Sequence, residues 1–108
     1  MSYTRVRTES FTWPIKVASP SDGGIQHSQT FTGKLKRLRR DQLNEWIAKG
    51  DLDLVRAVLV GWDGVNGSDG LPIEFSAAAL DDELQEQGFI RGVVEAIIEA
   101  TSGAQAKN

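Results

Sequence analysis

The sequence predicts an α+β fold in which an N-terminal β-hairpin packs against a small bundle of about four α-helices. Two observations predict it. Apolar and polar residues alternate over about residues 10–38, as they do in half-buried strands, whereas apolar residues in the second half recur with the spacing of helices. A chain of 108 residues is expected to form a single domain, with flexible tails at 1–9 and 101–108.

The hairpin is expected at about residues 10–38. Residues 11–17 alternate strictly, and Pro14 cannot donate a ladder hydrogen bond, so this strand is predicted at the edge of a sheet. Residues 19–24 are rich in Ser, Pro, Asp and Gly and predict the turn. The second strand carries Phe31 and Leu35 on one face and Ser, Thr and Lys on the other. A hairpin alone is marginally stable in water, so its apolar face needs a cover.

Four helices are expected to supply that cover, at about residues 41–49, 52–62, 76–87 and 89–100. Asp41 and Ser76 are suited to cap the first and the third helix, since their side chains can accept from free backbone N–H groups. Gly50 and Gly88 are expected to end the first and the third helix, because glycine is common just beyond a helix C-terminus.

The apolar faces of the second and fourth helices follow from residue spacing. The second helix places five apolar residues on one stripe: Leu54, Val55, Val58, Leu59 and Trp62. The fourth has the strongest helical periodicity in the chain, with six apolar residues on one face: Phe89, Ile90, Val93, Val94, Ile97 and Ile98. These stripes predict which helix surfaces face the hairpin.

The composition argues against an enzyme. The chain has no cysteine and a single histidine, and it contains neither a Gly-x-Ser-x-Gly nor a His-Glu-x-x-His motif. We therefore expect no catalytic residue, no metal site and no cofactor. No apolar run reaches the roughly 20 residues of a membrane-spanning helix, so no membrane association is expected.

The segment 61–70, with sequence GWDGVNGSDG, is the one stretch that resembles a chemical site. Asp63 and Glu74 have the spacing of the first and last ligands of a calcium loop, but Val65, Gly67 and Ser68 stand where that loop needs oxygen ligands and a glycine. A phosphate loop would need a preceding strand and a following lysine, and here the preceding residues are predicted to be helical. The segment is therefore expected to be a bend between two helices, in which glycines adopt positive φ.

A basic run occupies residues 34–40. Its five cations are Lys34, Lys36, Arg37, Arg39 and Arg40. Such a cluster can contact phosphates, but the pI near 5.1 and the lack of interleaved aromatic residues disfavour a nucleic-acid-binding protein. The run can also discourage edge pairing of the strand or contact an acidic protein surface. These alternatives remain open at this point.

The charge is distributed unevenly along the chain. Residues 1–50 hold nine Lys or Arg and four Asp or Glu, whereas residues 51–108 hold three and eleven, so the halves carry +5 and −8. These halves can attract each other within one fold, or they can favour contacts between copies, since the basic part of one molecule suits the acidic part of the next.

The order of motifs resembles that of a known family. From residue 31 the chain runs FTGKLKRLRRDQLNEWI, then LVGWDGVNGSDGLPIEFSAAALDDELQ, then a final apolar helix. This order resembles the tail assembly chaperones of long-tailed bacteriophages. The resemblance covers about residues 11–100 and is most specific over 61–76. The matching residues are Gly61, Trp62, Asp63, Gly64, Val65, Asp69, Gly70, Pro72, Phe75 and Ser76, and Leu80 and Leu84 match the following helix.

The resemblance implies a role in virion assembly. Proteins of this family coat the tape measure protein, keep it soluble, help to recruit tail tube subunits, and are absent from the mature virion. It implies a location in the cytoplasm of the infected or lysogenic bacterial host. Besides the basic run, the residues expected to contact partners are Trp46, Trp62, Phe89, Ile90 and Val94. The alternatives are a structural virion protein, such as a head–tail connector or tail component, and a nucleic-acid-binding regulator that uses residues 34–40.

Overall fold

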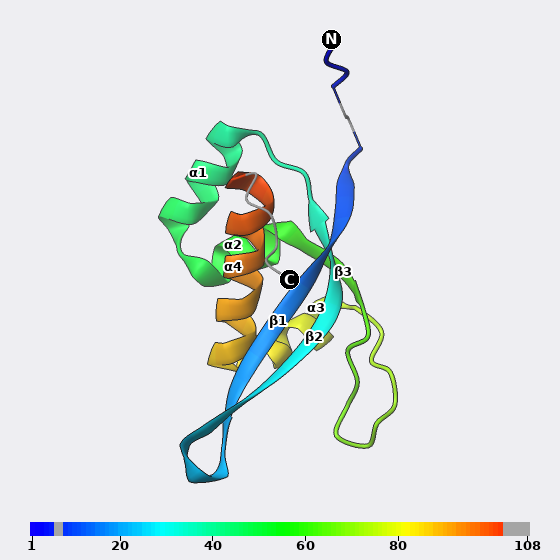
Figure 1. Cartoon of the computed structure of the whole chain (residues 1–108), viewed down its shortest axis with the longest axis vertical. Helices are drawn as coiled ribbons and strands as arrows, with labels where there is room; N and C mark the ends of the chain where they lie inside the picture. Colours follow the sequence, from blue (N-terminus) through cyan, green and yellow to red (C-terminus); the bar gives the residue numbers. More distant parts are fainter. Residues whose placement is uncertain (6–7, 103–108) are drawn as a thin grey trace.

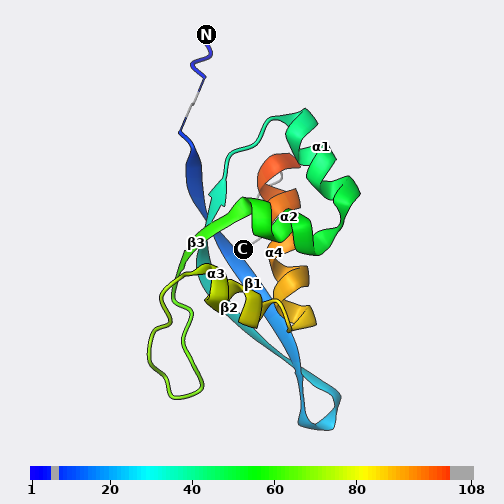
Figure 2. The ribbon, with the colours of Figure 1, turned by 180° about the vertical axis from the view of Figure 1, so that it is seen from behind.

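The computed structural model describes residues 1–5 and 8–102. The elements follow one another as β1 (Ser10–Ser21), a short 3-10 turn (Asp22–Gly24), β2 (Ile25–Lys36), α1 (Arg40–Lys49), α2 (Asp51–Val58), β3 (Leu59–Asp63), α3 (Ala77–Glu83) and α4 (Gln87–Ser102). The strands form one antiparallel sheet in the order β1-β2-β3, and the helices cover one of its faces (Figures 1 and 2). The predicted α+β class is confirmed.

The hairpin of β1 and β2 forms where the alternation predicts it. Its register pairs Ile15 with Phe31 and Trp13 with Gly33, and β1 is an edge strand, as Pro14 indicates. Ile15, Phe31 and Gly33 are buried on the face that the helices cover. A side chain at Gly33 would overlap the Ile15 side chain, so glycine at this position lets Ile15 lie flat across the sheet.

The third strand, β3, is a correction to the sequence prediction. Residues 59–63 are expected to complete a helix, but they pair with β2, with Trp62 opposite Gly33 and Gly61 opposite Lys34. A bulge at Val60 shifts the register between Gly61 and Leu59. An apolar residue at position 59 fits the covered side of a helix as well as that of a strand. The apolar spacing therefore does not distinguish a helix from a strand here. The free edge of β2 and the low helix propensity of Gly61 favour the strand.

The helix boundaries are partly as predicted. Gly50, with φ 115°, ends α1, and the Ser76 hydroxyl accepts from Ala79 N at 3.0 Å and caps α3. Asp41 does not cap α1, which begins at Arg40; its carboxylate accepts from Gln42 N inside the first turn. The third helix ends at Glu83 rather than at residue 87, because the chain turns there and buries Leu84.

Gly88 does not separate two helices, as the sequence suggests, but lies in the first turn of α4. A Cβ atom at Gly88 would overlap the carbonyl oxygen of Ala18, and one at Gly92 would overlap that of Lys16. The two glycines therefore let α4 approach the backbone of β1 more closely than any other residue would. This contact seats the longest helix diagonally on the edge strand (Figure 1).

Some residues within the expected tails make contacts. Arg37 donates to the Thr8 carbonyl and, through its backbone N–H, to the Glu9 carbonyl, so residues 8 and 9 are held beside the end of β2. At the other end, α4 continues to Ser102, and the Thr101 hydroxyl donates to the Ile97 carbonyl at 2.7 Å. Residues 6–7 and 103–108 lie outside the described part of the chain.

The core lies between the sheet and the helices. The buried hydrophobic residues form one cluster: Ile15, Phe31, Leu35, Leu54, Val55, Val58, Leu59, Leu80, Leu84, Phe89, Val93, Ala96 and Ile97. On the opposite face of the sheet Thr12, Thr32 and Lys34 are exposed. The hairpin is thus apolar on one face and polar on the other, as its alternation predicts.

Candidate functional site

An aromatic cluster anchors the segment of residues 61–76. Trp62 lies on the covered face of β3, and its indole N–H donates to the Ile73 carbonyl at 2.8 Å. The Trp62 ring meets Phe75 edge-on, with ring centroids 4.9 Å apart. Beside it the rings of Phe31 and Phe89 are stacked, with centroids 5.6 Å apart. Trp62 therefore fastens both ends of the segment 61–76 to the core.

The segment itself projects as a narrow loop and does not join two helices, which corrects the expected bend. Ile73 N donates to Val65 O at 2.8 Å and Gly67 N donates to Leu71 O at 2.9 Å, so the two sides of the loop pair like a short hairpin. Gly64 and Gly70 have φ values of 90° and 83°, as expected of glycines in turns.

Side-chain hydrogen bonds fix the tip of this loop and the start of the helix after it. The Asp69 carboxylate accepts from Leu71 N at 3.0 Å, and Ser76 caps the helix that follows. Pro72 pairs with Asn66 across the loop. Each of these motif residues thus has a structural role. Within residues 1–5 and 8–102 no three His, Cys, Asp or Glu side chains lie close enough together to hold a metal ion.

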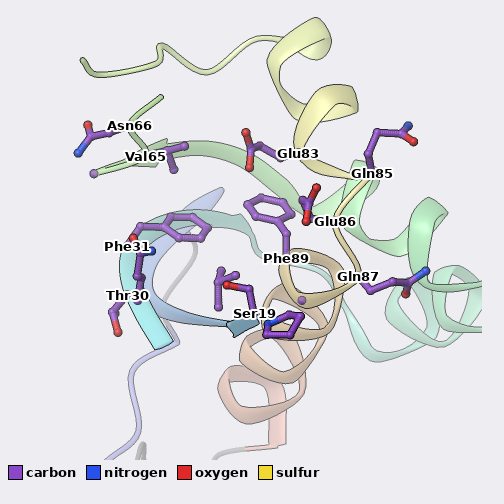
Figure 3. Close-up of a pocket in the computed structure, with 15 residues that line it drawn as sticks. Ser19, Thr30, Phe31, Val65, Asn66, Glu83, Gln85, Glu86, Gln87 and Phe89 are labelled. Atoms are coloured by element: carbon purple, nitrogen blue, oxygen red, sulfur yellow. The ribbon is translucent and has the colours of Figure 1, made fainter. Parts of the chain in front are cut away.

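An open groove of about 500 Å³ lies beside the aromatic cluster. Figure 3 shows Phe31 from β2 and Phe89 from α4 side by side in its lining, with Val65 on the side of the loop. The turn between α3 and α4 forms another wall, and the end of the hairpin forms the third. The lining residues thus come from segments centred near positions 18, 30, 65 and 86, and no local pattern in the sequence could have brought them together.

Two carboxylates, Glu83 and Glu86, stand over this groove from the α3–α4 turn (Figure 3). Partial burial raises the pKa of the Glu83 carboxyl above its usual value, and the negative charges of Asp82 and Glu86 raise it further. The groove thus combines an apolar floor with a local excess of negative charge. That combination suits a ligand that carries both an apolar group and a cation.

The edge of β2 beside the groove is unpaired. β3 pairs only with Thr32–Leu35, so within the described chain residues 25–31 of β2 have a strand neighbour on one side only, which is β1. Alternate backbone N–H and C=O groups of such a strand point outward and can pair with a further strand. Gln29, Thr30 and Phe31 belong both to this edge and to the groove lining.

A second candidate surface is the outer side of the helices, which we call the helical layer: α1, α2 and the C-terminal half of α4. Of the expected partner residues, Trp46, Ile90 and Val94 are half-buried against the core, whereas Phe89 is only 3% exposed and is a core residue. Three further apolar residues on these helices are exposed and are not among the expected partner residues: Ile47, Leu52 and Ile98. The exposure of Ile98 also corrects its expected place on the covered face of the last helix. Helical spacing alone could not separate these residues from the core.

The basic run does not form one patch. Lys34 and Lys36 lie on the exposed face of the sheet, whereas Arg39 and Arg40 stand at the start of α1. The Arg37 guanidinium lies 4.9 Å from the centroid of the Phe11 ring and donates to Thr8. All five cations lie at the surface, but they point from different elements, and Arg37 is already engaged by the protein.

Among residues 1–5 and 8–102 no ion pair joins the basic half of the chain to the acidic half. The ion pair found among the described residues joins Arg56 to Asp81 at 3.0 Å, and both residues belong to the acidic half. Of the two explanations for the charge asymmetry, the structure therefore gives no support to ion pairs between the halves of one chain.

Comparison of the chain with protein-family models, with curated proteins and with solved structures gives no match. Among residues 1–5 and 8–102 no helix has the length and apolar character needed to cross a membrane.

Proposed function

We propose that this protein is a tail assembly chaperone of a long-tailed bacteriophage, which binds the tape measure protein during assembly and does not remain in the virion. The observation that carries the proposal is the sequence of residues 61–76. Its Gly-Trp-Asp-Gly-Val turn and Pro-x-x-Phe-Ser segment resemble that family. In the structure Trp62 and Phe75 pack on each other and Ser76 caps α3, so the resemblance concerns residues that act together.

The helical layer offers a surface for such a client. A tape measure protein is a long amphipathic chain, and a coat of small proteins would shield its apolar stripes from aggregation. Ile47, Leu52 and Ile98 are each 45–52% exposed on this layer, beside the half-buried Trp46. These side chains are the ones that we expect to contact the client. No catalytic residue is part of this proposal.

A role as a small structural protein of the virion is the second candidate. It would use the same fold and the same apolar surface, and it differs in that the protein would persist in mature particles. A nucleic-acid-binding role has less support, because the five cations of the basic run lie on separate elements.

Co-expression with the tape measure protein of the same phage tests the proposal. We expect the tape measure protein to stay in the soluble fraction when this chain is present, and to copurify with it. Ile98→Lys, at an exposed position of the helical layer, should weaken copurification, because a lysine does not bury its charge against an apolar stripe.

Leu71→Lys is the matched control. Leu71 is 64% exposed, more so than Ile98, but lies in the projecting loop, so this variant should protect the tape measure protein as well as the wild type does. A tape measure protein that is equally insoluble with and without the chain would contradict the proposal. If both variants lost copurification with the tape measure protein to the same extent, the helical layer would not be the surface that binds it.

A further inference from the structure

The N-terminal segment and the groove lie at opposite ends of the molecule and have complementary properties. Residues 1–5 project beyond the start of β1, whereas the groove lies toward the hairpin turn, in a molecule 51 Å long (Figure 1). Tyr3 is 86% exposed, and Arg5 is exposed beside it. The segment thus offers an aromatic ring and a cation, and the groove offers an aromatic floor and two carboxylates.

We propose that the N-terminal segment of one copy binds in the groove of a second copy, where it adds as a short strand to the open edge of β2. Residues 25–31 of β2 lack a second strand neighbour within the described chain, because β3 pairs only from Thr32 onward. A segment of five residues fits within this free length. Its backbone would take up the N–H and C=O groups that β2 leaves unpaired, which is a common way for a sheet to bind an extended peptide.

The side chains of the segment fit the lining of the groove. Tyr3 and Arg5 are two residues apart, so on a strand they point to the same face, with a separation of about 7 Å. Tyr3 would pack on Val17 and Val65, which are half-buried in the lining beside the buried rings of Phe31 and Phe89, and the Arg5 guanidinium would face Glu83 and Glu86. A cation at this place also relieves the mutual repulsion of the carboxylates, which contributes to the raised pKa of Glu83.

The occupant is a second copy because the segment points away from the groove of its own chain. Thr8 and Glu9 are bound to Arg37 at the start of β1, and residues 1–5 lie beyond this end of the strand (Figure 1). A contact between two different surfaces leaves one of each free on the pair, so repetition would join copies head to tail, in a row or, where the rotation closes, in a ring. The same arrangement brings the basic half of one chain to the acidic half of the next. It uses neither the helical layer nor a client protein, so it stands independently of the proposed function.

Sedimentation velocity on the full chain over a range of concentrations tests this contact. The wild type should associate as its concentration rises, and salt should weaken the association. Arg5→Glu, and separately the double variant Glu83→Arg with Glu86→Arg, should each weaken it by about tenfold or more in Kd. An equimolar mixture of the two variants should associate again, because both contacts are then complementary. The carboxylate introduced into the N-terminal segment of one copy meets the guanidinium groups introduced into the groove of the other, and the unchanged Arg5 of the second copy meets the unchanged Glu83 and Glu86 of the first.

Arg91→Glu is the control, since it makes the same charge change at an exposed site on α4 outside the groove. It should associate like the wild type. Arg5 lies outside every helix and strand, so its variant cannot act through the fold. A chain that is monomeric at all concentrations would overturn the proposal. So would association that survives Arg5→Glu, or equal weakening by Arg91→Glu, or a mixture of the two charge-reversed variants that stays apart.

Discussion

At the scale of single residues, Gly92 gives the sharpest stability prediction. Gly92→Ala should destabilise the fold by about 1–3 kcal/mol, because a Cβ atom would overlap the Lys16 carbonyl and push α4 off β1. The sign is informative, since alanine normally stabilises a helix interior by about 1 kcal/mol relative to glycine. Chemical denaturation measures the change. Glu95→Ala, on the exposed face of α4, should change stability by less than about 0.5 kcal/mol, and stabilisation by Gly92→Ala would contradict the close packing.

Trp62 gives a second prediction at this scale. Trp62→Phe keeps an aromatic ring but leaves the half-buried Ile73 carbonyl without its donor, which should cost about 1–2 kcal/mol. The loop 64–73 should also become more sensitive to proteolysis, since its return side is then fastened less firmly. Trp46→Phe is the matched comparison, because Trp46 is half-buried too but belongs to α1, away from this loop (Figure 1). If the two variants had the same free energy of unfolding and the same resistance to proteolysis, Trp62 would not anchor the loop.

The raised pKa of Glu83 makes the free energy of unfolding depend on pH. Its pKa is raised in the folded chain, so the folded state holds the proton more strongly than the unfolded state does. The free energy of unfolding should therefore fall as the pH rises from the ordinary value of 4.5 through the raised pKa, and stay lower above it. Glu83→Gln should remove this fall. It should be the more stable protein at pH 7, by less than about 1 kcal/mol because the group is partly exposed.

Thermal unfolding at several pH values checks this sign. The difference between Glu83→Gln and the wild type should shrink below pH 4.5, where the wild-type carboxyl is protonated in both states. If the glutamine variant were less stable than the wild type at pH 7, the folded protein would stabilise the charged form of Glu83. That result would contradict the raised pKa that burial and the neighbouring carboxylates imply.

At the scale of elements, α1 is the least firmly held helix. None of its residues is buried, and it reaches the core only through partly buried side chains such as Leu43 and Trp46. α4, by contrast, buries Phe89, Val93 and Ile97. Amide hydrogen exchange should therefore be faster throughout α1 than in the middle of α4. Equal protection of the two helices would mean that something other than core burial holds α1.

The elements also show how far the sequence predicts this fold. The alternation of residues 11–17 and the periodicity after residue 88 predict the hairpin and α4, because each pattern fits one period only. β3 could not be predicted, since Leu54, Val58 and Leu59 fit a helical stripe that continues to Trp62. The free edge of β2, which together with Gly61 favours a strand, appears only in the folded chain. The role of Gly88 could not be predicted either. The sequence shows only a glycine between two helical patterns, which predicts a helix end, whereas its contact with Ala18 joins residues far apart in the sequence.

The candidate site could be predicted only in part. The sequence of 61–76 identifies residues that the structure brings together, such as Trp62, Phe75 and Ser76. It could not show that Phe89 is buried and that Ile98 is exposed, because both residues lie on the apolar side of one helical pattern. The groove could not be predicted, because its lining comes from four segments that are distant in the sequence. The same contacts bring Glu83 and Glu86 to the groove and give it a negative charge.

At the scale of the whole molecule, the structure offers three separate surfaces. The helical layer carries exposed apolar side chains, the groove carries carboxylates and an open strand edge, and the outer face of the sheet is polar. A protein that coats a long client needs contacts to the client and contacts between copies. Because contacts to the client and contacts between copies would use different surfaces, both kinds of contact could form at the same time.

The central claim is that the protein binds the tape measure protein during assembly and then leaves. Its most direct test is quantitative mass spectrometry of two samples from one induced culture: the material that copurifies with the tagged chain, and the purified phage particles. We predict that the tape measure protein is the main partner in the first sample and that this chain is absent from the second. Stoichiometric amounts of the chain in mature particles, or a first sample without tape measure protein, would contradict the account.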